Sequence, residues 1–125
     1  MNFNKLVRIA RNTKEVIDTK QKHFSFILLK NNIISFGWNQ SWKTHPLAAR
    51  FNHRFNNIHS EISAIKNMQK NWALLTKCRL VNIRIRSNGE LGLSKPCRYC
   101  LKAIIDFDIR EVYYSNENGD FDLLK

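Results

Sequence analysis

Apolar and polar positions along the chain follow two periods that predict an alternation of helices and strands. Over residues 2–18 the apolar side chains fall on one stripe at helical spacing, and most lysines and arginines lie off it. Residues 23–29 and 33–38 are rich in the apolar and aromatic side chains of buried strands, and a short polar link joins them. The beginning of the chain therefore predicts a helix followed by an antiparallel strand pair.

The same alternation continues after residue 58. The expected elements are a helix over 59–69, a strand over 80–86, a helix from residue 96 and a strand over 111–115. Asn-Gly pairs mark tight turns at 88–89 and 118–119. Residues 90–93 are expected to pair back briefly after the first turn, and residues 120–124 after the second. The order α-β-β-α-β-α-β-β predicts an α/β fold over residues 1–125, a three-layer α-β-α sandwich on a mixed sheet of about five strands.

Residues 39–58 show no clear period and are predicted to form a long loop. A loop of this length in a compact domain is usually functional or disordered. Cations and aromatic rings mix in it, which suits a single nucleic-acid strand held by phosphate neutralisation and base stacking. The alternative is that these aromatic rings pack the loop onto the sheet. The residues expected to contact nucleic acid are Trp42, Lys43, Arg50 and Arg54.

Charge adds to the case for an anionic partner. The 125 residues contain 21 lysines and arginines against 10 acidic residues, a formal net charge of +11. A field of this strength on a small domain attracts polyanions, and single-stranded nucleic acid is the expected partner. A compositional bias that enriches lysine together with asparagine is the alternative explanation, because asparagine is also abundant.

Other features of the composition indicate the compartment. No apolar run approaches the roughly 20 residues that span a bilayer, so no membrane segment is expected. The N-terminus does not resemble a secretory signal, and the number of cysteines, three, is odd. We therefore expect reduced thiols and a cytoplasmic protein.

Two short motifs carry the candidate chemistry. H-x-E runs from His59 to Glu61 at the start of one predicted helix, and P-C-x-x-C places Cys97 and Cys100 at the start of another. A catalytic zinc ion takes three protein ligands and keeps a fourth position for water. Cys97 and Cys100 lie three residues apart on one helical turn, and a helix N-terminus beside a cation favours their thiolate form. The motifs predict one Zn²⁺ per chain, bound by His59, Cys97 and Cys100.

Two other interpretations of these cysteines account for fewer features of the two motifs. A redox pair would leave His59 and Glu61 without a role, and a structural zinc site would need a fourth good ligand. Glu61 lies two residues beyond His59, where it can take a proton from the zinc-bound water and deliver it to the substrate. The backbone N–H of Ser60 is free at the helix start and can hold a carbonyl oxygen of a pyrimidine.

The remaining cysteine and histidines are not expected to bind the metal. Cys78 stands alone beside a predicted strand and is expected to be a small core residue. His23, His45 and His53 lie in loops or at strand ends, where solvation or hydrogen bonding is more common than metal binding.

H-S-E together with P-C-R-Y-C resembles the cytidine and deoxycytidylate deaminase superfamily. This superfamily includes tRNA adenosine deaminases and the cytidine deaminases that edit DNA and RNA. The resemblance extends over about residues 3–116 in the order of elements, and it implies a cytidine deaminase-like fold and zinc-dependent hydrolysis. F-G-W-N at 36–39 matches a strand that ends in G-[YW]-N, which implies that Asn39 contacts the sugar of the target nucleotide. Trp38 in this motif and His45 in the loop that follows are expected at the substrate as well.

The subfamily stays open at this point. The segment between the two motifs is longer than is usual in the editing enzymes, and Ser94-Lys95 before the second motif matches neither the DNA editors nor the tRNA deaminases. The predicted final hairpin resembles free-cytidine and bacterial toxin deaminases.

The sequence thus leaves several functions. The favoured one is conversion of cytosine to uracil in single-stranded nucleic acid, with DNA preferred over RNA. The alternative is a deaminase of free dCMP or cytidine, with a nucleotide monomer as its partner. A tRNA adenosine deaminase is less favoured, as is a non-catalytic zinc module that binds nucleic acid. The intact Glu61 argues against the last, because a structural site has no use for that carboxylate.

Overall fold

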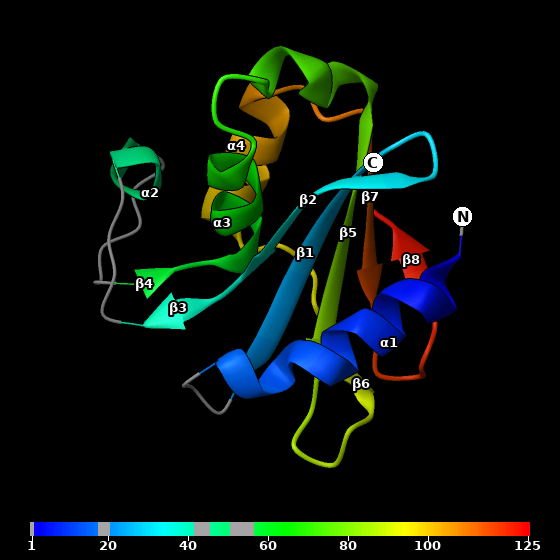
Figure 1. The fold of residues 1–125 in the computed structure, drawn as a ribbon. Helices are drawn as coiled ribbons and strands as arrows, with labels where there is room; N and C mark the ends of the chain where they lie inside the picture. Colours follow the sequence, from blue (N-terminus) through cyan, green and yellow to red (C-terminus); the bar gives the residue numbers. More distant parts are fainter. Residues whose placement is uncertain (1, 18–20, 42–45, 51–56) are drawn as a thin grey trace.

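The computed structural model describes residues 2–17, 21–41, 46–50 and 57–125 (Figure 1). The N-terminal elements are α1 (Phe3–Thr13), the 3-10 turn η1 (Lys14–Val16), β1 (Lys22–Leu29), β2 (Asn32–Trp38), β3 (Gln40–Ser41), α2 (Pro46–Arg50) and β4 (Asn57–Ile58). The remaining elements are α3 (Ser60–Asn67), the 3-10 helix η2 (Trp72–Lys77), β5 (Cys78–Ile85), β6 (Leu91–Gly92), α4 (Arg98–Asp106), β7 (Glu111–Ser115) and β8 (Phe121–Leu123).

One mixed sheet forms the centre of the fold. Its strands lie in the order β2-β1-β5-β7-β8, and β6 pairs with the end of β5 to make six. Only β5 and β7 run parallel, and α4 connects them, whereas the other neighbouring strands are antiparallel. The α/β prediction is confirmed. The sixth strand arises because the chain turns at Asn88-Gly89 and pairs Leu91 with Ile85.

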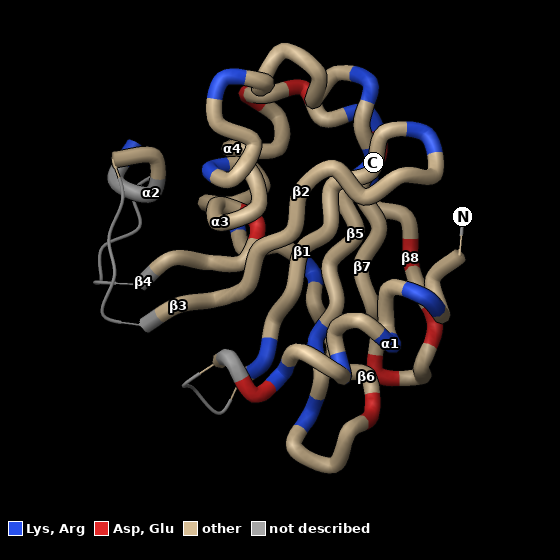
Figure 2. The backbone as a smooth tube through the Cα atoms, in the orientation of Figure 1, with Lys and Arg blue, Asp and Glu red and all other residues tan. Residues whose placement is uncertain are grey.

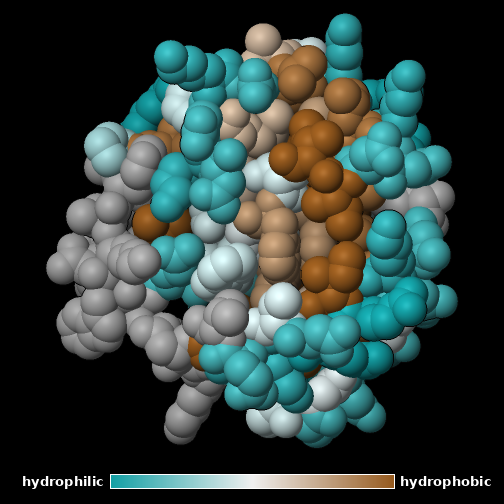
Figure 3. Space-filling model, viewed as in Figure 1, coloured by the Kyte–Doolittle hydropathy of each residue, from teal (hydrophilic) through white to brown (hydrophobic). Residues whose placement is uncertain are grey.

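Helices cover both faces of the sheet, so the predicted three layers are present (Figure 1). Helix α1 packs against one face, while α3 and α4 cover the other. Alternation along the strands separates two cores. Phe26 of β1 and Ile83 of β5 belong to the core beneath α1, whereas Ile27 and Leu80 belong to the core beneath α3 and α4. Hydrophilic residues cover much of the viewed surface, and a band of apolar residues runs between them (Figure 3).

Backbone contact fixes α3 on the strand pair. A Cβ atom added to Gly37 of β2 would lie only 2.3 Å from the backbone nitrogen of Ala64 in α3. The hydroxyl of Ser35 donates to the carbonyl oxygen of Ala64 at 2.6 Å, and the amide of Asn67 donates to the carbonyl oxygen of Phe36 at 2.8 Å. Strand β2 therefore sets the position of the helix that begins after His59.

The prediction of a loop over residues 39–58 is wrong in part. Strands β3 and β4 pair antiparallel at its ends, and α2 lies between them with Leu47 buried. Pro46 opens α2 at a position where proline favours a helix, but elements of two to five residues are too short to show a period. The predicted N-terminal helix also ends earlier, at Thr13, where η1 takes over, and η2 had no counterpart in the prediction.

The expectation that Cys78 is a core residue agrees with the structure. Cys78 is fully buried in the core beneath α3 and α4. Among the described residues, no helix has both the length and the apolar character needed to cross a bilayer.

Candidate metal centre and active site

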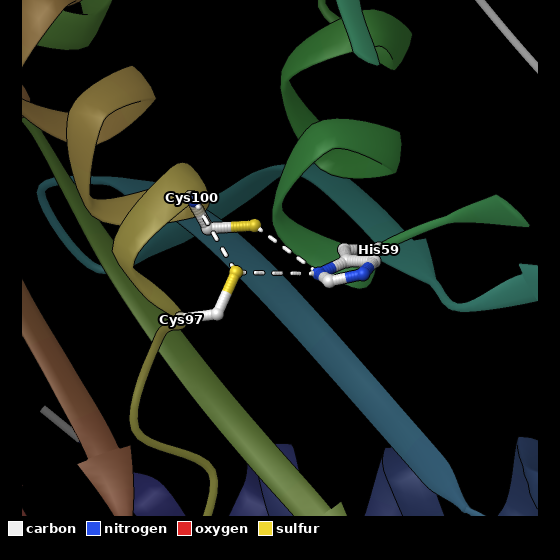
Figure 4. A group of neighbouring side chains, drawn as sticks. All are labelled: His59, Cys97 and Cys100. Carbon is white, nitrogen blue, oxygen red and sulfur yellow. Dashed lines mark hydrogen bonds between the residues drawn. The ribbon is translucent and has the colours of Figure 1, made fainter. Parts of the chain in front are cut away.

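Two helix starts bring the predicted metal ligands together. His59 is the N-cap residue of α3, and Cys97 is the N-cap residue of α4 with Cys100 one turn further on. Figure 4 shows both sulfur atoms pointing toward the imidazole. The Nδ1 atom of His59 lies 3.6 Å from Sγ of Cys97 and 3.5 Å from Sγ of Cys100. The three ligand atoms all lie within 4.8 Å of one another.

These separations fit a zinc ion. Zinc binds cysteine sulfur at about 2.3 Å and histidine nitrogen at about 2.0–2.1 Å, in tetrahedral geometry. Those bond lengths place the nitrogen and sulfur ligands about 3.6 Å apart, which matches the observed pair of distances. Thiolate and imidazole are also ligands that suit zinc. The zinc site predicted from the motifs therefore has its ligands in place.

Electrostatics around the ligands favours one thiolate. Hydrogen bonds with the Cys100 side chain and with His59 lower the pKa of Cys97 to about 3, against the opposing effect of burial. The pKa of Cys100 is raised, because of its interaction with Cys97 and its own burial. The pKa of His59 is raised by its hydrogen bond with Cys97. Metal binding requires thiolates and a neutral imidazole, so it must displace protons from these groups.

Glu61 lies on the first turn of α3 with its carboxylate buried, at 6% exposure. The hydroxyl of Ser60 donates to Oε1 at 3.1 Å, and the side-chain amide of Asn82 donates to Oε2 at 3.0 Å. Burial is the largest influence and raises the pKa of Glu61 above its usual value. A raised pKa makes a carboxylate a stronger proton acceptor, which suits a group that exchanges protons with a bound water or substrate.

A pocket of about 300 Å³ opens beside these groups. Its lining combines the zinc helices with the ends of the strands: Gln21, His23, Asn39, Gln40, Ile58, His59, Ser60, Glu61, Ser94, Lys95 and Cys97. Metal ligands, a buried carboxylate and a concave space thus meet at one place, which is the arrangement expected of an active site.

Asn39 and Ser60, two of the residues predicted to contact substrate, line this pocket. The carboxamide of Asn39 is held by the backbone of the strand opposite. Its Oδ1 accepts from the N–H of His23 at 2.9 Å, and its Nδ2 donates to the carbonyl oxygen of Gln21 at 2.8 Å. Asn39 therefore ties the end of β2 to the start of β1 at the pocket wall.

Trp38 and Arg50 lie elsewhere. Trp38 is half-buried and packs edge-on against Phe36 in the core on the α1 side, because the strand alternation turns both rings to that face. Arg50 forms an ion pair with Asp106 of α4 at 2.7 Å, and its guanidinium lies over the ring of Phe107. The other predicted contact residues lie outside the described residues: Trp42, Lys43, His45 and Arg54.

The sequence did not indicate two residues of the site. His23 was expected to be solvated or hydrogen-bonded and was given no role at the substrate, yet it lines the pocket, and burial together with the charges of Arg84 and His59 lowers its pKa to about 4. Asn82 was not singled out although it bonds the carboxylate of Glu61. A usable signal existed, because Asn82 follows Cys78 and Leu80 at alternate positions of one strand and breaks their apolar pattern.

Comparison with known proteins identifies the family. A sequence model of the "Cytidine and deoxycytidylate deaminase zinc-binding region" matches residues 2–116. The chain belongs to this deaminase family. It is accordingly a hydrolytic deaminase, and zinc is the metal that its site binds. No curated protein sequence matches this deaminase at a significant level.

Solved structures share the fold of this deaminase. Cytidine deaminase from Burkholderia pseudomallei superimposes with a TM-score of 0.69 at 15% identity, covering 100% of this chain and 93% of that one. The dCMP deaminase of cyanophage S-TIM5 superimposes in its apo form with a TM-score of 0.55 at 20% identity, covering 95% and 89%. The same phage enzyme in complex with dCMP and dUMP gives 0.57 at 18% identity, covering 91% and 80%.

Proposed function

We propose that this deaminase converts cytosine to uracil on a free nucleoside or nucleotide. The observation that carries the proposal is the pocket of about 300 Å³ between the zinc ligands and the strand ends, a volume at the lower end of small-ligand sites. The solved structures with the same fold, a cytidine deaminase and a dCMP deaminase, point to the same substrate class. Lys95 lines the pocket and is exposed, so it supplies a cation for the phosphate of a nucleotide.

The residues divide the chemistry among them. His59, Cys97 and Cys100 hold the zinc, which when bound makes hydroxide available near neutral pH. Glu61 accepts the proton of the attacking water at its carboxylate and delivers protons to the ring nitrogen and to the departing amino group. Oxygen from water bonds to C4, the bond between C4 and the amino nitrogen breaks, and ammonia leaves.

Polar groups of the pocket wall orient the substrate. The backbone N–H of Ser60 lies at the start of α3, where helix N–H groups lack intrahelical acceptors, and it holds the pyrimidine carbonyl oxygen. Asn39, already held by the backbone at positions 21 and 23, presents its carboxamide to the sugar.

The net charge of +11 favours a second candidate, cytosine in single-stranded nucleic acid. Figure 2 shows Lys and Arg distributed over several elements of the described chain. Of the four residues predicted to contact a strand, Arg50 is engaged by Asp106, and the rest lie outside the described residues. The monomer is the better supported substrate, because its evidence comes from the pocket itself.

Mass-spectrometric deamination assays on matched substrates test the proposal. The panel contains cytidine, deoxycytidine, dCMP, single-stranded DNA and single-stranded RNA, each at low and moderate salt. Glu61→Ala protein is the blank. We expect conversion of the monomers with little dependence on salt. Conversion of the oligonucleotides alone, falling steeply with salt, would overturn the monomer proposal and establish a nucleic-acid editor.

A further inference from the structure

Two buried polar side chains stand on the zinc side of the sheet. Ser25 of β1 and Asn82 of β5 are direct cross-strand partners, and they are 0% and 2% exposed. Their neighbours on the same face, Ile27 and Leu80, are core residues. Burying a hydroxyl and a carboxamide costs free energy unless hydrogen bonds replace water, so the bonds that these groups form indicate their role.

Their hydrogen bonds lead to the catalytic carboxylate. The Nδ2 group of Asn82 donates to Oε2 of Glu61 at 3.0 Å and to the carbonyl oxygen of Ser94 at 3.3 Å. The Oδ1 atom of Asn82 accepts from the hydroxyl of Ser25 at 2.7 Å. Ser25 also contacts the hydroxyl of Ser60 at 2.8 Å, and Ser60 bonds Oε1 of Glu61 at 3.1 Å. Helix α3 thus holds one carboxylate oxygen of Glu61, and the sheet holds the other.

The same contacts fix which end of the Asn82 carboxamide faces Glu61. A backbone carbonyl can only accept, so the carbonyl oxygen of Ser94 requires the Nδ2 end of the amide, and the hydroxyl of Ser25 can then donate to Oδ1. In that orientation Nδ2 points to the carboxylate. A flipped amide would set Oδ1 against both Oε2 of Glu61 and the carbonyl oxygen of Ser94, so that acceptors face each other and both of these bonds are lost.

We propose that Asn82, oriented by the carbonyl oxygen of Ser94 and bonded by Ser25, is a positioning residue that fixes the plane of the Glu61 carboxylate for proton transfer. The inference rests on the deaminase activity proposed above. A carboxylate on the first turn of a helix has rotamer freedom, and general acid–base catalysis requires its oxygens within hydrogen-bond reach of the proton that moves. The bond from β5 removes this freedom, because it joins the side chain to the rigid centre of the sheet.

Steady-state kinetics of two Asn82 variants test the role. Asn82→Leu keeps the approximate volume but removes the donor, and Asn82→Asp keeps the shape but turns an acceptor toward Glu61. We expect kcat to fall about 10- to 100-fold in both, since misplacement loses part of the benefit of acid–base catalysis. KM is expected to change less than about threefold, with zinc content per chain unchanged, because neither substrate contacts nor metal ligands are altered. Ser25→Ala removes the hydroxyl that bonds Oδ1 but leaves the Ser94 carbonyl to hold the amide, so it should lower kcat less, by about 3- to 10-fold.

Ser115→Ala is the matched control. Ser115 is also buried and hydrogen-bonded, to Ser94 and to the carbonyl oxygen of Gly92, but it does not contact Glu61. It should lower the melting temperature while leaving kcat per zinc-loaded molecule within about twofold of the parent.

The outcomes separate the two proposals. If the unsubstituted enzyme deaminates no cytosine monomer, the proposed function fails, and the same variants are then assayed on the substrate that it does convert. If the enzyme is active but zinc-loaded Asn82 variants keep kcat within twofold of the parent, the positioning role is overturned. Should Asn82→Leu fail to fold, Asn82→Asp and Ser25→Ala give the same decision.

Discussion

The two faces of the sheet differ in what their strands bury. Under α1 the inward residues of β1 and β5 are apolar, with Phe24, Phe26, Val81 and Ile83 fully buried. Under α3 and α4 the apolar positions give way to polar ones toward the zinc ligands, where Ser25 and Asn82 replace the expected hydrophobic pair. The face under α1 contributes apolar burial to stability. The face under α3 and α4 has polar side chains in place of apolar ones at the positions that reach the active site.

This difference shows how one strand can serve both purposes. Asn82 and Ile83 are consecutive in β5, yet the alternation of a strand turns them to opposite faces. A substitution at one position should therefore affect catalysis, and a substitution at the next should affect stability. The predictions below test this separation, beginning with the change that should damage both properties.

Cys97→Ala should lose zinc, all measurable activity and part of the stability. The variant lacks one of three ligands and the group that accepts from the backbone N–H of Cys100 at the start of α4. Metal analysis of the purified protein and thermal unfolding with and without added zinc measure both effects. A variant that retains one zinc per chain and turnover would contradict the ligand assignment.

Glu61→Ala should lower kcat by about 1,000-fold or more, while the protein keeps its zinc and its fold. The carboxylate is buried and its pKa is raised by burial, so removing it relieves a desolvation cost and should not lower the melting temperature strongly. Activity, zinc content and thermal unfolding are measured on one preparation. Retained activity would rule out Glu61 as the proton carrier.

Ile83→Ala should lower stability and leave turnover nearly unchanged. Ile83 is fully buried beneath α1, and its truncation should lower the free energy of unfolding by about 2–5 kcal/mol through lost burial and a cavity. Urea denaturation measures this loss, and kcat at low temperature should stay within about twofold of the parent. A large fall in kcat at full zinc occupancy would show that the two faces are not independent.

Lowering the pH should reduce the stability of the fold by a smaller amount, through a group on the zinc face of the sheet. Burial, with the charges of Arg84 and His59, lowers the pKa of His23 from 6.5 to about 4, so the unfolded chain binds more protons between those pH values. Stability from this group is therefore complete above pH 6.5 and is lost as pH falls toward 4. Because the ring is partly exposed, we expect about 1–2 kcal/mol rather than the full linkage value.

Urea denaturation at several pH values measures this effect, with His23→Gln as the comparison. The pH dependence of His23→Gln should be flatter than that of the parent by this amount. Identical slopes in the two proteins would show that His23 titrates normally.

The sequence predicted the zinc ligands and Glu61 because their relations are local. His59 and Glu61 are two residues apart, Cys97 and Cys100 three, and a helix start places each pair without reference to the rest of the chain. Helices and strands with a clear period were predicted for the same reason. The short β3, α2 and β4 were not, since no period can develop over so few residues.

The supporting residues were missed because their relations are not local. Ser25 and Asn82 are 57 positions apart and meet only through the register of β1 on β5. His23 reaches the pocket because β2 turns Asn39 back onto the start of β1. Neither register nor strand order follows from the residues themselves, so the surroundings of Glu61 become visible only in the folded sheet.

The contact at Gly37 has a consequence for how the sequence can change over time. Because the backbones of β2 and α3 meet there with no side chain between them, any side chain at position 37 would have to push α3 away from the sheet. Apolar residues elsewhere in that core can be exchanged for others of similar volume. Position 37 allows no such exchange, because any residue other than glycine would move α3, and His59 and Glu61 with it.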